Sequence, residues 1–485
     1  MTRRSRFPQS IAFYPSLAVG ERSRLAHEAL LLTPRLLVVL LLSPLLLLMG
    51  TSLACSSRPQ APDGEASAPS AGSFASFVST LSGDAVDQDA AVANYLAQHG
   101  PTPLMEDGGR VVFLVDPGEW LAAQPESGAS VALERGAENG PRGGGDDVRL
   151  LADFNGWGWE EVPAEERRLE PVGRSGWRWK AVQLEPGARV EYAYAVGERV
   201  LADPHNPRRV AGWEEDVSLL TLEPREAERI PGLHALLSVE EGQPELPALD
   251  AERLEVFEHV SSFLPGTRRR VQIYRPVIES SESASSEFGA SEPLPTVYFG
   301  DGSAYAGRGR VPQMLDALIA AGVLRPLIAV FVDPVDRYRE YRRHSGFRRM
   351  MVEEIVPRVD ASYPTLQDPS GRLLVGGSRG ALAAVDLAHT HPQVFGHVAA
   401  IAPAVSGSDL VSTIAESPRV AMDPYVLIGR YDRRWAPDGY ALAEALRSAG
   451  YSPTVVEVPE GHSLTAWRLR LPAMLEHFFP GPEAR

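Results

Sequence analysis

The pattern of apolar and polar positions changes along the chain. From residue 74 to residue 99, apolar side chains recur at helical spacing, and the pattern ends at Gly100-Pro101. Short apolar segments bounded by turn residues follow, as is typical of a β-sandwich. The strands expected in this part cover residues 110–115, 148–152, 177–184 and 189–196. We therefore predict a helical lead and a small β-sandwich domain over residues 74–245.

Strand-like and helix-like segments alternate from residue 246 onward. The short β-rich runs cover residues 269–274, 296–299, 327–332, 373–376, 398–401, 425–428 and 454–458. Helical patterns lie between them at residues 311–321, 346–361, 381–389 and 438–449. Such alternation implies a mostly parallel sheet with helices on both faces. Residues 246–485 are thus expected to form an α/β domain built as a three-layer sandwich.

An apolar run lies near the N-terminus at residues 36–49, behind several arginines. It is shorter than the roughly 20 residues of a membrane-spanning helix and fits the apolar core of a signal peptide. The small residues before Cys55 resemble a bacterial lipobox, although Ser52 stands where that motif has leucine. We expect residues 1–55 to be a lipoprotein-type signal segment with lipidation at Cys55, and residues 56–73 to be a flexible tether. An uncleaved membrane anchor and an ordinary cleaved signal are the alternatives.

Composition narrows the functional classes. The chain has 485 residues, of which 44% are hydrophobic and 23% charged, as in soluble globular proteins. Its formal net charge of −16 argues against nucleic-acid binding, because such proteins present a basic face to the phosphates. Its single cysteine excludes an intramolecular disulfide. With the N-terminal segment, these features predict an exported protein, lipid-anchored at a bacterial membrane and facing the periplasm or the cell exterior. They leave its oligomeric state open.

A G-x-S-x-G sequence at residues 376–380 carries the strongest chemical signal. It follows an apolar run and precedes a helical pattern, which is the strand–turn–helix context of a nucleophile elbow. The turn is too sharp for side chains at the glycine positions, and the helix N-terminus behind the serine favours negative charge on a substrate. Ser378 is therefore the candidate nucleophile.

A serine hydroxyl needs a base to accept its proton, and an acid orients that base. In this arrangement the acid and then the base follow the serine, each at the end of a later strand. Asp432 follows the expected strand at 425–428, and His462 follows the expected strand at 454–458. These two residues are the candidate acid and base. The alternative acids are Asp438, Glu457 and Glu460.

The same arrangement stabilises a developing oxyanion with two backbone N–H groups. One belongs to the residue after the nucleophile, Arg379. The other lies in the loop after the expected strand at 296–299, where Gly302 or Ser303 is the candidate donor. An ordinary turn is the alternative interpretation of that loop.

Residues 256–479 resemble the putative-esterase family, which includes enterochelin esterases, feruloyl and acetylxylan esterases, and esterase D. The resemblance rests on VYFGDG at 297–302, VDRYREY at 335–341, GGSRGALAAVDLAHTHPQVFG at 376–396 and GHSLTAWRLRL at 461–471. It implies an α/β-hydrolase fold with Ser378, Asp432 and His462 as the catalytic triad. It further implies a set of substrate-binding residues, namely Arg339, Glu340, Trp467 and Arg468. Arg379 and Ala381 depart from the apolar residue and the glycine that the family usually has after the serine.

The predicted sandwich also has a likeness. The stretches VRLLADFNGWG at 148–158, VEYAYAV at 190–196 and LADPHNP at 201–207 resemble the Ig-like early-set domain of isoamylases and glycogen-binding modules. The likeness implies an Ig-like fold for this domain. Its tryptophans could stack on sugar rings, although aromatic residues in a sandwich more often belong to the core. They are Trp157, Trp159, Trp177 and Trp179.

These observations predict a serine carboxylic-ester hydrolase that works through an acyl-enzyme without a metal or redox cofactor. The expected substrate is a small-molecule or glycan ester, such as a siderophore ester or an acylated glycan. The arginine-rich stretch at 337–349 could receive an anionic substrate, or be solvated and paired with acids. Two alternatives stay open. One is a non-catalytic glycan- or siderophore-binding lipoprotein with a degenerate esterase domain, and the other is an acyltransferase of the same fold.

Overall fold

The computed structural model describes residues 73–118, 147–158, 162–197, 199–211, 216–222, 253–277 and 292–482. The predicted signal segment, Cys55, nearly all of the predicted tether and the expected domain boundary near residue 246 lie outside these ranges. Within them, no helix combines the length and the apolar character that crossing a membrane requires.

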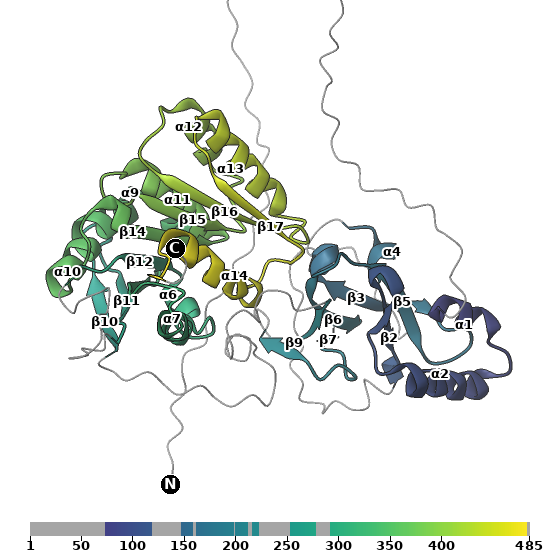
Figure 1. Ribbon diagram of the computed structural model, residues 1–485. Helices are drawn as coiled ribbons and strands as arrows, with labels where there is room; N and C mark the ends of the chain where they lie inside the picture. The colour runs from purple at the N-terminus through teal and green to yellow at the C-terminus, as the bar shows by residue number, and fades with distance from the viewer. Residues whose placement is uncertain are drawn as a thin grey trace, which may run out of the picture. The chain divides into compact units, whose positions relative to one another are not determined.

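Two antiparallel sheets form the N-terminal part (Figure 1). One has the strand order β1-β2-β5-β4, and the other has the order β3-β6-β9-β8 with β7 beside β6. Their bounds are β1 Leu104–Glu106, β2 Arg110–Val115, β3 Val148–Ala152, β4 Glu170–Pro171, β5 Arg178–Gln183, β6 Arg189–Val196, β7 Arg199–Leu201, β8 Arg209–Ala211 and β9 Asp216–Thr221. The strands predicted for this part are present, each within a residue of its expected ends.

Strand β2 is buried on both faces, which explains its nearly continuous apolar sequence. Val111 and Phe113 point into the core between the two sheets, where they pack with Tyr192 of β6. Val112 and Leu114 point the opposite way, into a second core that they share with the helical lead. That lead consists of α1 (Phe74–Thr80) and α2 (Ala85–His99). The sandwich is therefore a three-layer unit of helices, sheet and sheet.

The described tryptophans of this part are packed residues. Trp177 and Trp179 belong to the core beneath α1 and α2, and Trp157 packs against a small cluster around Ala193. Trp159 lies outside the described residues. Packing within the fold thus accounts for these described side chains without a sugar ligand.

An eight-stranded mixed sheet organises the C-terminal part, in the order β10-β11-β13-β12-β14-β15-β16-β17. Strand β11 pairs antiparallel with both β10 and β13, and the strands from β13 through β12 to β17 pair in parallel. The bounds are β10 Leu254–Val260, β11 Arg268–Tyr274, β12 Thr296–Gly300, β13 Ile328–Val332, β14 Arg372–Gly377, β15 His397–Ile401, β16 Asp423–Gly429 and β17 Thr454–Val458. Strand β10 is an addition to the prediction, because its mostly exposed residues give it no apolar run.

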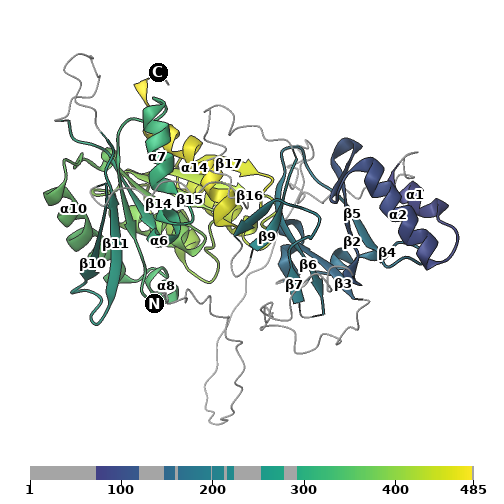
Figure 2. The ribbon, with the colours of Figure 1, turned by 90° about the horizontal axis from the view of Figure 1, so that it is seen from below.

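Helices cover both faces of this sheet (Figures 1 and 2). One face carries α9 (Ser345–Arg349), α10 (Val356–Ser362), α11 (Arg379–Thr390), α12 (Leu410–Glu416) and α13 (Ala436–Ser448). The other face carries α6 (Gly302–Ala306), α7 (Val311–Ala320) and α14 (Leu464–Phe478). Successive residues of β12 serve the two cores in turn, since Val297 and Phe299 face the second group of helices and Tyr298 faces the first. The predicted three-layer α/β architecture is confirmed.

Candidate active site

Ser378 stands at a sharp turn between β14 and α11. Its backbone is left-handed, with φ of 56°, and its N–H donates to the Ile401 carbonyl at 2.8 Å. A Cβ on Gly376 would lie 2.1 Å from the Gly380 carbonyl oxygen, and a Cβ on Gly377 would lie 2.5 Å from the Trp467 ring. Glycine is thus required at both positions, because neighbouring atoms leave no room for a Cβ. The strained Ser378 backbone immediately precedes a helix, as in a nucleophile elbow.

Asp432 and His462 are in direct contact. Asp432 follows β16, His462 follows β17, and His462 Nδ1 lies 2.6 Å from Asp432 Oδ2. The Asp432 carboxylate is 5% exposed, and its second oxygen accepts the Trp435 N–H at 3.2 Å. With Nδ1 bound to the acid, Nε2 is the ring nitrogen that can take a proton from a serine. This is the geometry that orients an imidazole as a general base.

The alternative acids are engaged elsewhere. Asp438 accepts hydrogen bonds from the N–H groups of Val405 and Ser406, both at 2.6 Å. Glu460 pairs with Arg470, and Glu457 accepts the Tyr440 hydroxyl at 2.8 Å. Of the four carboxylates considered, Asp432 is therefore the one that the structure joins to His462.

Two helix N-termini supply the candidate oxyanion donors. Arg379 begins α11 and Gly302 begins α6, so neither N–H has a carbonyl partner within its own helix. Ser303, the other candidate, donates its N–H to Asp333 Oδ1 at 2.6 Å and its hydroxyl to Asp333 Oδ2. The Ser303 N–H is therefore already bound to Asp333, so Gly302 is the better candidate for the second oxyanion donor.

A half-buried polar network holds the Gly302 loop against the nucleophile strand. Asp301, with φ of 52°, accepts two hydrogen bonds from Arg337, Nε at 2.8 Å and a terminal nitrogen at 2.9 Å. The Asp301 N–H donates to the Tyr341 hydroxyl at 2.7 Å, and Arg337 also reaches the Gly377 carbonyl at 3.4 Å. Burial, followed by the Asp301 charge, raises the pKa of Tyr341 well above its usual range, so this phenol stays neutral. Arg337 and Tyr341 both lie in the VDRYREY stretch. The family resemblance of this stretch implied a role for the neighbouring pair Arg339-Glu340 and did not indicate Arg337 or Tyr341.

The residues predicted to bind substrate are mostly buried. Glu340 is 2% exposed and is bound to Arg269 by hydrogen bonds of 2.6 and 3.3 Å. Arg468 is 1% exposed and donates to the Arg308 carbonyl at 3.3 Å. Both side chains thus lie in the interior of the fold, and direct substrate contact by Glu340 and Arg468 stays a prediction. Arg339 is exposed on α8 (Arg337–Glu340), and Trp467 packs its ring against His462 at 4.9 Å.

Arginines and aromatic rings surround the elbow. The Arg379 guanidinium lies 4.6 Å from the Tyr338 ring centre, and Arg342 lies 5.5 Å from the same ring. Arg434 lies 4.8 Å from the ring of Trp435, which is 6.4 Å from the His462 ring. Burial, together with the charges of Arg337, Arg342 and Arg434, lowers the pKa of Arg379, while Tyr338 opposes this shift. Among the described residues, the structure gives Arg379, Arg342 and Arg434 no carboxylate partner.

The rest of the arginine-rich stretch is neutralised. Arg343 and Arg348 both bind the buried Asp386 carboxylate, at 2.8 and 2.7 Å. Arg349 pairs with Glu353 at 2.8 Å. The acid-paired interpretation therefore holds for part of the predicted cluster. Arg342 instead donates to the Tyr338 hydroxyl at 2.9 Å and to the Gly407 carbonyl.

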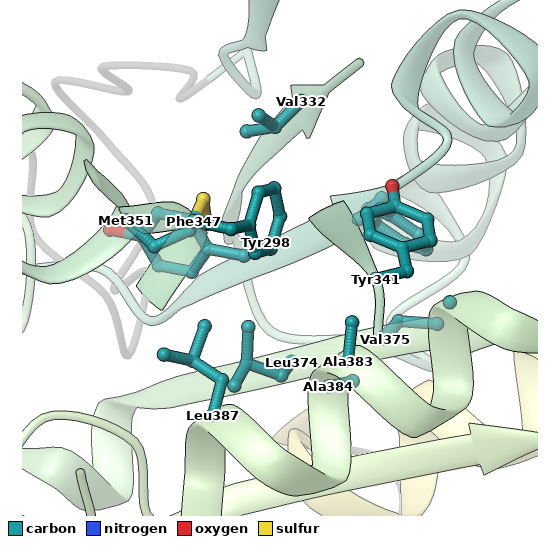
Figure 3. A pocket seen from close by; sticks show the side chains of 13 residues that line it. Tyr298, Val332, Tyr341, Phe347, Met351, Leu374, Val375, Ala383, Ala384 and Leu387 are labelled. Atoms are coloured by element: carbon teal, nitrogen blue, oxygen red, sulfur yellow. The ribbon is translucent and has the colours of Figure 1, made fainter. Parts of the chain in front are cut away.

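A small interior cavity lies near the site but is separate from it. Figure 3 shows it lined by Tyr298, Tyr341, Phe347, Met351 and Leu387, between the sheet and α11. Its volume is about 20 Å³, close to the space of one water molecule. It is therefore a packing gap beneath the elbow and too small for an ester substrate.

Residues 264–474 match the model of the family described as putative esterase. The iron(III) enterobactin esterase of Dickeya dadantii (strain 3937) is 27% identical over 308 residues, which make up 59% of this chain and 66% of that protein. An endo-1,4-β-xylanase/feruloyl esterase of Xylanibacter ruminicola is 23% identical over 203 residues, or 39% of this chain and 27% of that protein. The chain thus spans less than two thirds of the length of either curated relative. The resemblance to this family is confirmed.

Solved structures share the fold. The ferric enterobactin esterase of Salmonella typhimurium has a TM-score of 0.57 at 18% identity, covering 79% of this chain and 98% of that one. The enterobactin esterase of Shigella flexneri in the presence of enterobactin has a TM-score of 0.56 at 18% identity, covering 80% and 97%. The expected α/β-hydrolase fold is confirmed, whereas the Ig-like assignment of the sandwich stays a prediction.

Proposed function

We propose that this chain, which carries a putative-esterase domain at residues 264–474, is a serine carboxylic-ester hydrolase that forms an acyl-enzyme on Ser378. The observation that carries the proposal is the 2.6 Å contact between Asp432 and His462 Nδ1. It fixes the tautomer in which Nε2 can accept the serine proton. A degenerate, binding-only domain has no need of this buried pair at the ends of β16 and β17.

Each proposed step has a residue to perform it. His462 takes the Ser378 proton as Oγ attacks the ester carbonyl carbon, and the backbone N–H groups of Arg379 and Gly302 stabilise the oxyanion. The tetrahedral intermediate collapses, the alkoxide leaves with the proton from His462, and the acyl group stays on Ser378. Water, deprotonated by His462, then attacks the acyl carbon, and His462 returns the proton to Ser378 Oγ as the bond to the serine breaks and the acid is released.

The proposed substrate is an ester whose acyl group or neighbouring groups are anionic and aromatic. The support is the set of arginines around the elbow that have no carboxylate partner among the described residues, namely Arg379 and Arg342 at Tyr338 and Arg434 at Trp435. Arginine attracts anions, and both arginine and aromatic rings stack on planar groups. A ferric catecholate siderophore ester fits both features, and a feruloylated glycan provides the aromatic part alone.

Removal of the nucleophile tests the reaction. Wild-type protein and Ser378→Ala would be compared on p-nitrophenyl acetate, a feruloylated glycan and ferric enterobactin. We expect the variant to lose activity by several orders of magnitude and to keep its circular dichroism spectrum, because only the oxyanion donors and substrate binding remain. Wild-type turnover by Ser378→Ala would overturn the proposal. Substrate binding by an inactive wild-type protein would favour the binding-only alternative.

Replacement of Arg379 tests the substrate class in the same panel. Arg379→Met should raise KM for the anionic ester about tenfold or more, because a charged contact is lost, and should leave p-nitrophenyl acetate within about twofold. Arg349→Met is the matched control, since that guanidinium is exposed and paired with Glu353. Equal loss on neutral and anionic esters would contradict a role in charge recognition.

We further propose that the protein is exported and lipid-anchored through Cys55 at a bacterial membrane, facing the periplasm or the cell exterior. The apolar run at residues 36–49 and the single cysteine support this proposal. Cys55→Ala should move the protein from the membrane fraction to the soluble fraction. Its retention in membranes after a carbonate wash would instead indicate an uncleaved helix.

A further inference from the structure

A buried carboxylate pair from the N-terminal sandwich lies against the loop that carries His462. Glu191 belongs to β6 and is 3% exposed, and Asp153 follows β3 and is 4% exposed. The Glu191 N–H donates to Asp153 Oδ2 at 2.8 Å, which links the two residues. Neither residue belongs to the part of the chain that matches the esterase family.

Glu191 binds both hydroxyls that flank the beginning of α14. Ser463 Oγ donates to Glu191 Oε1 at 2.7 Å, and Thr465 Oγ1 donates to the same oxygen. The same Ser463 Oγ accepts the Ala466 N–H at 3.1 Å, so it also caps the helix. Since Ser463 directly follows His462 in the chain, one carboxylate oxygen fixes both the helix start and the residue next to the base.

Asp153 restrains the other side of the same loop. A Cβ on Gly461 would lie 2.1 Å from Asp153 Cγ, so the backbone before His462 passes close against this carboxyl group. The Trp157 Nε1–H holds Asp153 Oδ1 at 2.9 Å, and the Arg189 N–H donates to the Pro459 carbonyl at 3.2 Å. His462 is thus bracketed, at the residue before it and the residue after it, by groups from the sandwich.

The loop that carries Asp432 also contacts the N-terminal sandwich. The Glu185 N–H donates to the Tyr431 hydroxyl at 2.9 Å, and Arg433 pairs with Glu166 at 2.7 Å. Tyr431 packs against the core of the sandwich. The residues on both sides of Asp432 therefore also contact the N-terminal domain.

We infer that Glu191 is a positioning residue for the general base, which makes the activity of the hydrolase domain depend on the sandwich. This inference rests on the proposed serine-esterase function. Loss of the Glu191 contacts releases the Ser463 and Thr465 hydroxyls and lets the His462 ring move relative to the serine and the ester. A misplacement of about 1 Å can lower turnover about 10²-fold, so the expected effect is a fall in kcat of about 10- to 100-fold with KM nearly unchanged.

Glu191→Met and Thr465→Val test the inference from the two sides of the contact, because methionine has a similar size but no oxygen to accept the two hydroxyls. The matched control is Asp203→Asn, because Asp203 is a fully buried acid of the same sandwich whose hydrogen bonds go to Tyr192, His205 and Ser218 instead of the His462 loop. We expect both test variants to lower kcat and their double variant to add little further loss, since the same contact is already broken. The control should lower the melting temperature and leave kcat within about twofold of wild type.

Three outcomes separate the possibilities. If kcat of Glu191→Met equals that of the control, or if the two test variants combine additively, the positioning role is overturned. If Glu191→Met loses its near-ultraviolet circular dichroism, Thr465→Val decides alone, and a wild-type kcat there overturns the inference. If Ser378→Ala is as active as wild type, the proposed function fails instead of the positioning role.

Discussion

The contact between Asp432 and His462 joins residues 30 positions apart in the chain, and it defines the chemistry at the residue scale. Both side chains follow parallel strands that are neighbours in the sheet, so their loops lie at the same edge. Sequence order was sufficient to rank Asp432 first among four acids. Only the structure shows which groups bind the other three acids. For example, no sequence pattern indicates that the Ser406 N–H donates to Asp438.

Replacement of the acid has a specific expected result. Asp432→Asn should keep the fold and KM but lower kcat by about 10⁴-fold, because the amide favours the imidazole tautomer with its proton on the wrong nitrogen. Asp438→Asn is the control: it weakens three hydrogen bonds to residues 405–406 and should affect stability more than turnover. Steady-state kinetics with a p-nitrophenyl ester measures both. A loss of less than about tenfold in Asp432→Asn would leave a Ser–His dyad as the better description.

Asp153 makes the stability of the protein depend on pH. Burial, and next the Glu191 charge, raise the pKa of Asp153 well above its ordinary value of 3.8. At a pH between 3.8 and the raised pKa, Asp153 is ionised in the unfolded chain but still protonated in the folded chain. The free energy of unfolding contributed by this group therefore decreases as pH rises from about 4 toward the raised pKa.

Asp153→Asn cannot ionise and should flatten this decrease. The measurement is the melting temperature of both proteins between about pH 5 and about pH 8. An unchanged slope in the variant would show that Asp153 is already ionised in the folded state across this range.

At the scale of elements, two helix beginnings form the candidate oxyanion hole, and one half-buried network supports it. The sequence predicted the elbow well, because a strand, a glycine-framed turn and a helix are adjacent in the chain. It predicted the second donor only to within two residues, since the choice depends on Asp333, which follows a different strand and occupies the Ser303 N–H. It missed the Arg337–Asp301–Tyr341 network, because the three residues are recognisable as a unit only when folded.

Replacement of Gly302 is the simplest test of the oxyanion donor at the start of α6. A Cβ at this position would lie 2.4 Å from the backbone carbon of Phe331, so Gly302→Ala must displace the start of α6 from β13. The displaced N–H should lower kcat by about 10²-fold, the usual effect of losing one oxyanion donor, with a smaller change in KM. Ala304→Gly is a milder change in the same helix and serves as the comparison. Equal activity of Gly302→Ala and wild type would remove this N–H from the mechanism.

At the scale of the whole molecule, the sandwich and the hydrolase sheet meet at the two loops that carry Asp432 and His462. The ion pair between Arg433 and Glu166 is exposed and contributes about 0–1 kcal/mol at most. The buried hydroxyl contacts of Glu191 are shielded from water, so they constrain position more strongly. The pattern of short strands bounded by turns in one part, and of alternating strands and helices in the other, predicted each domain separately. It could not predict their contact, because β6 has the sequence of an ordinary buried strand and only the fold shows what lies against Glu191.

The central claim is that an acyl group is carried by Ser378 and that His462 activates this serine. The most direct test is mass spectrometry of the protein quenched with acid during turnover of a slowly hydrolysed p-nitrophenyl ester. The account predicts an acyl adduct on the peptide that contains Ser378 in the wild type, and its loss in both Ser378→Ala and His462→Ala. Ester turnover with Ser378 unmodified, or with the adduct on another residue, would contradict it.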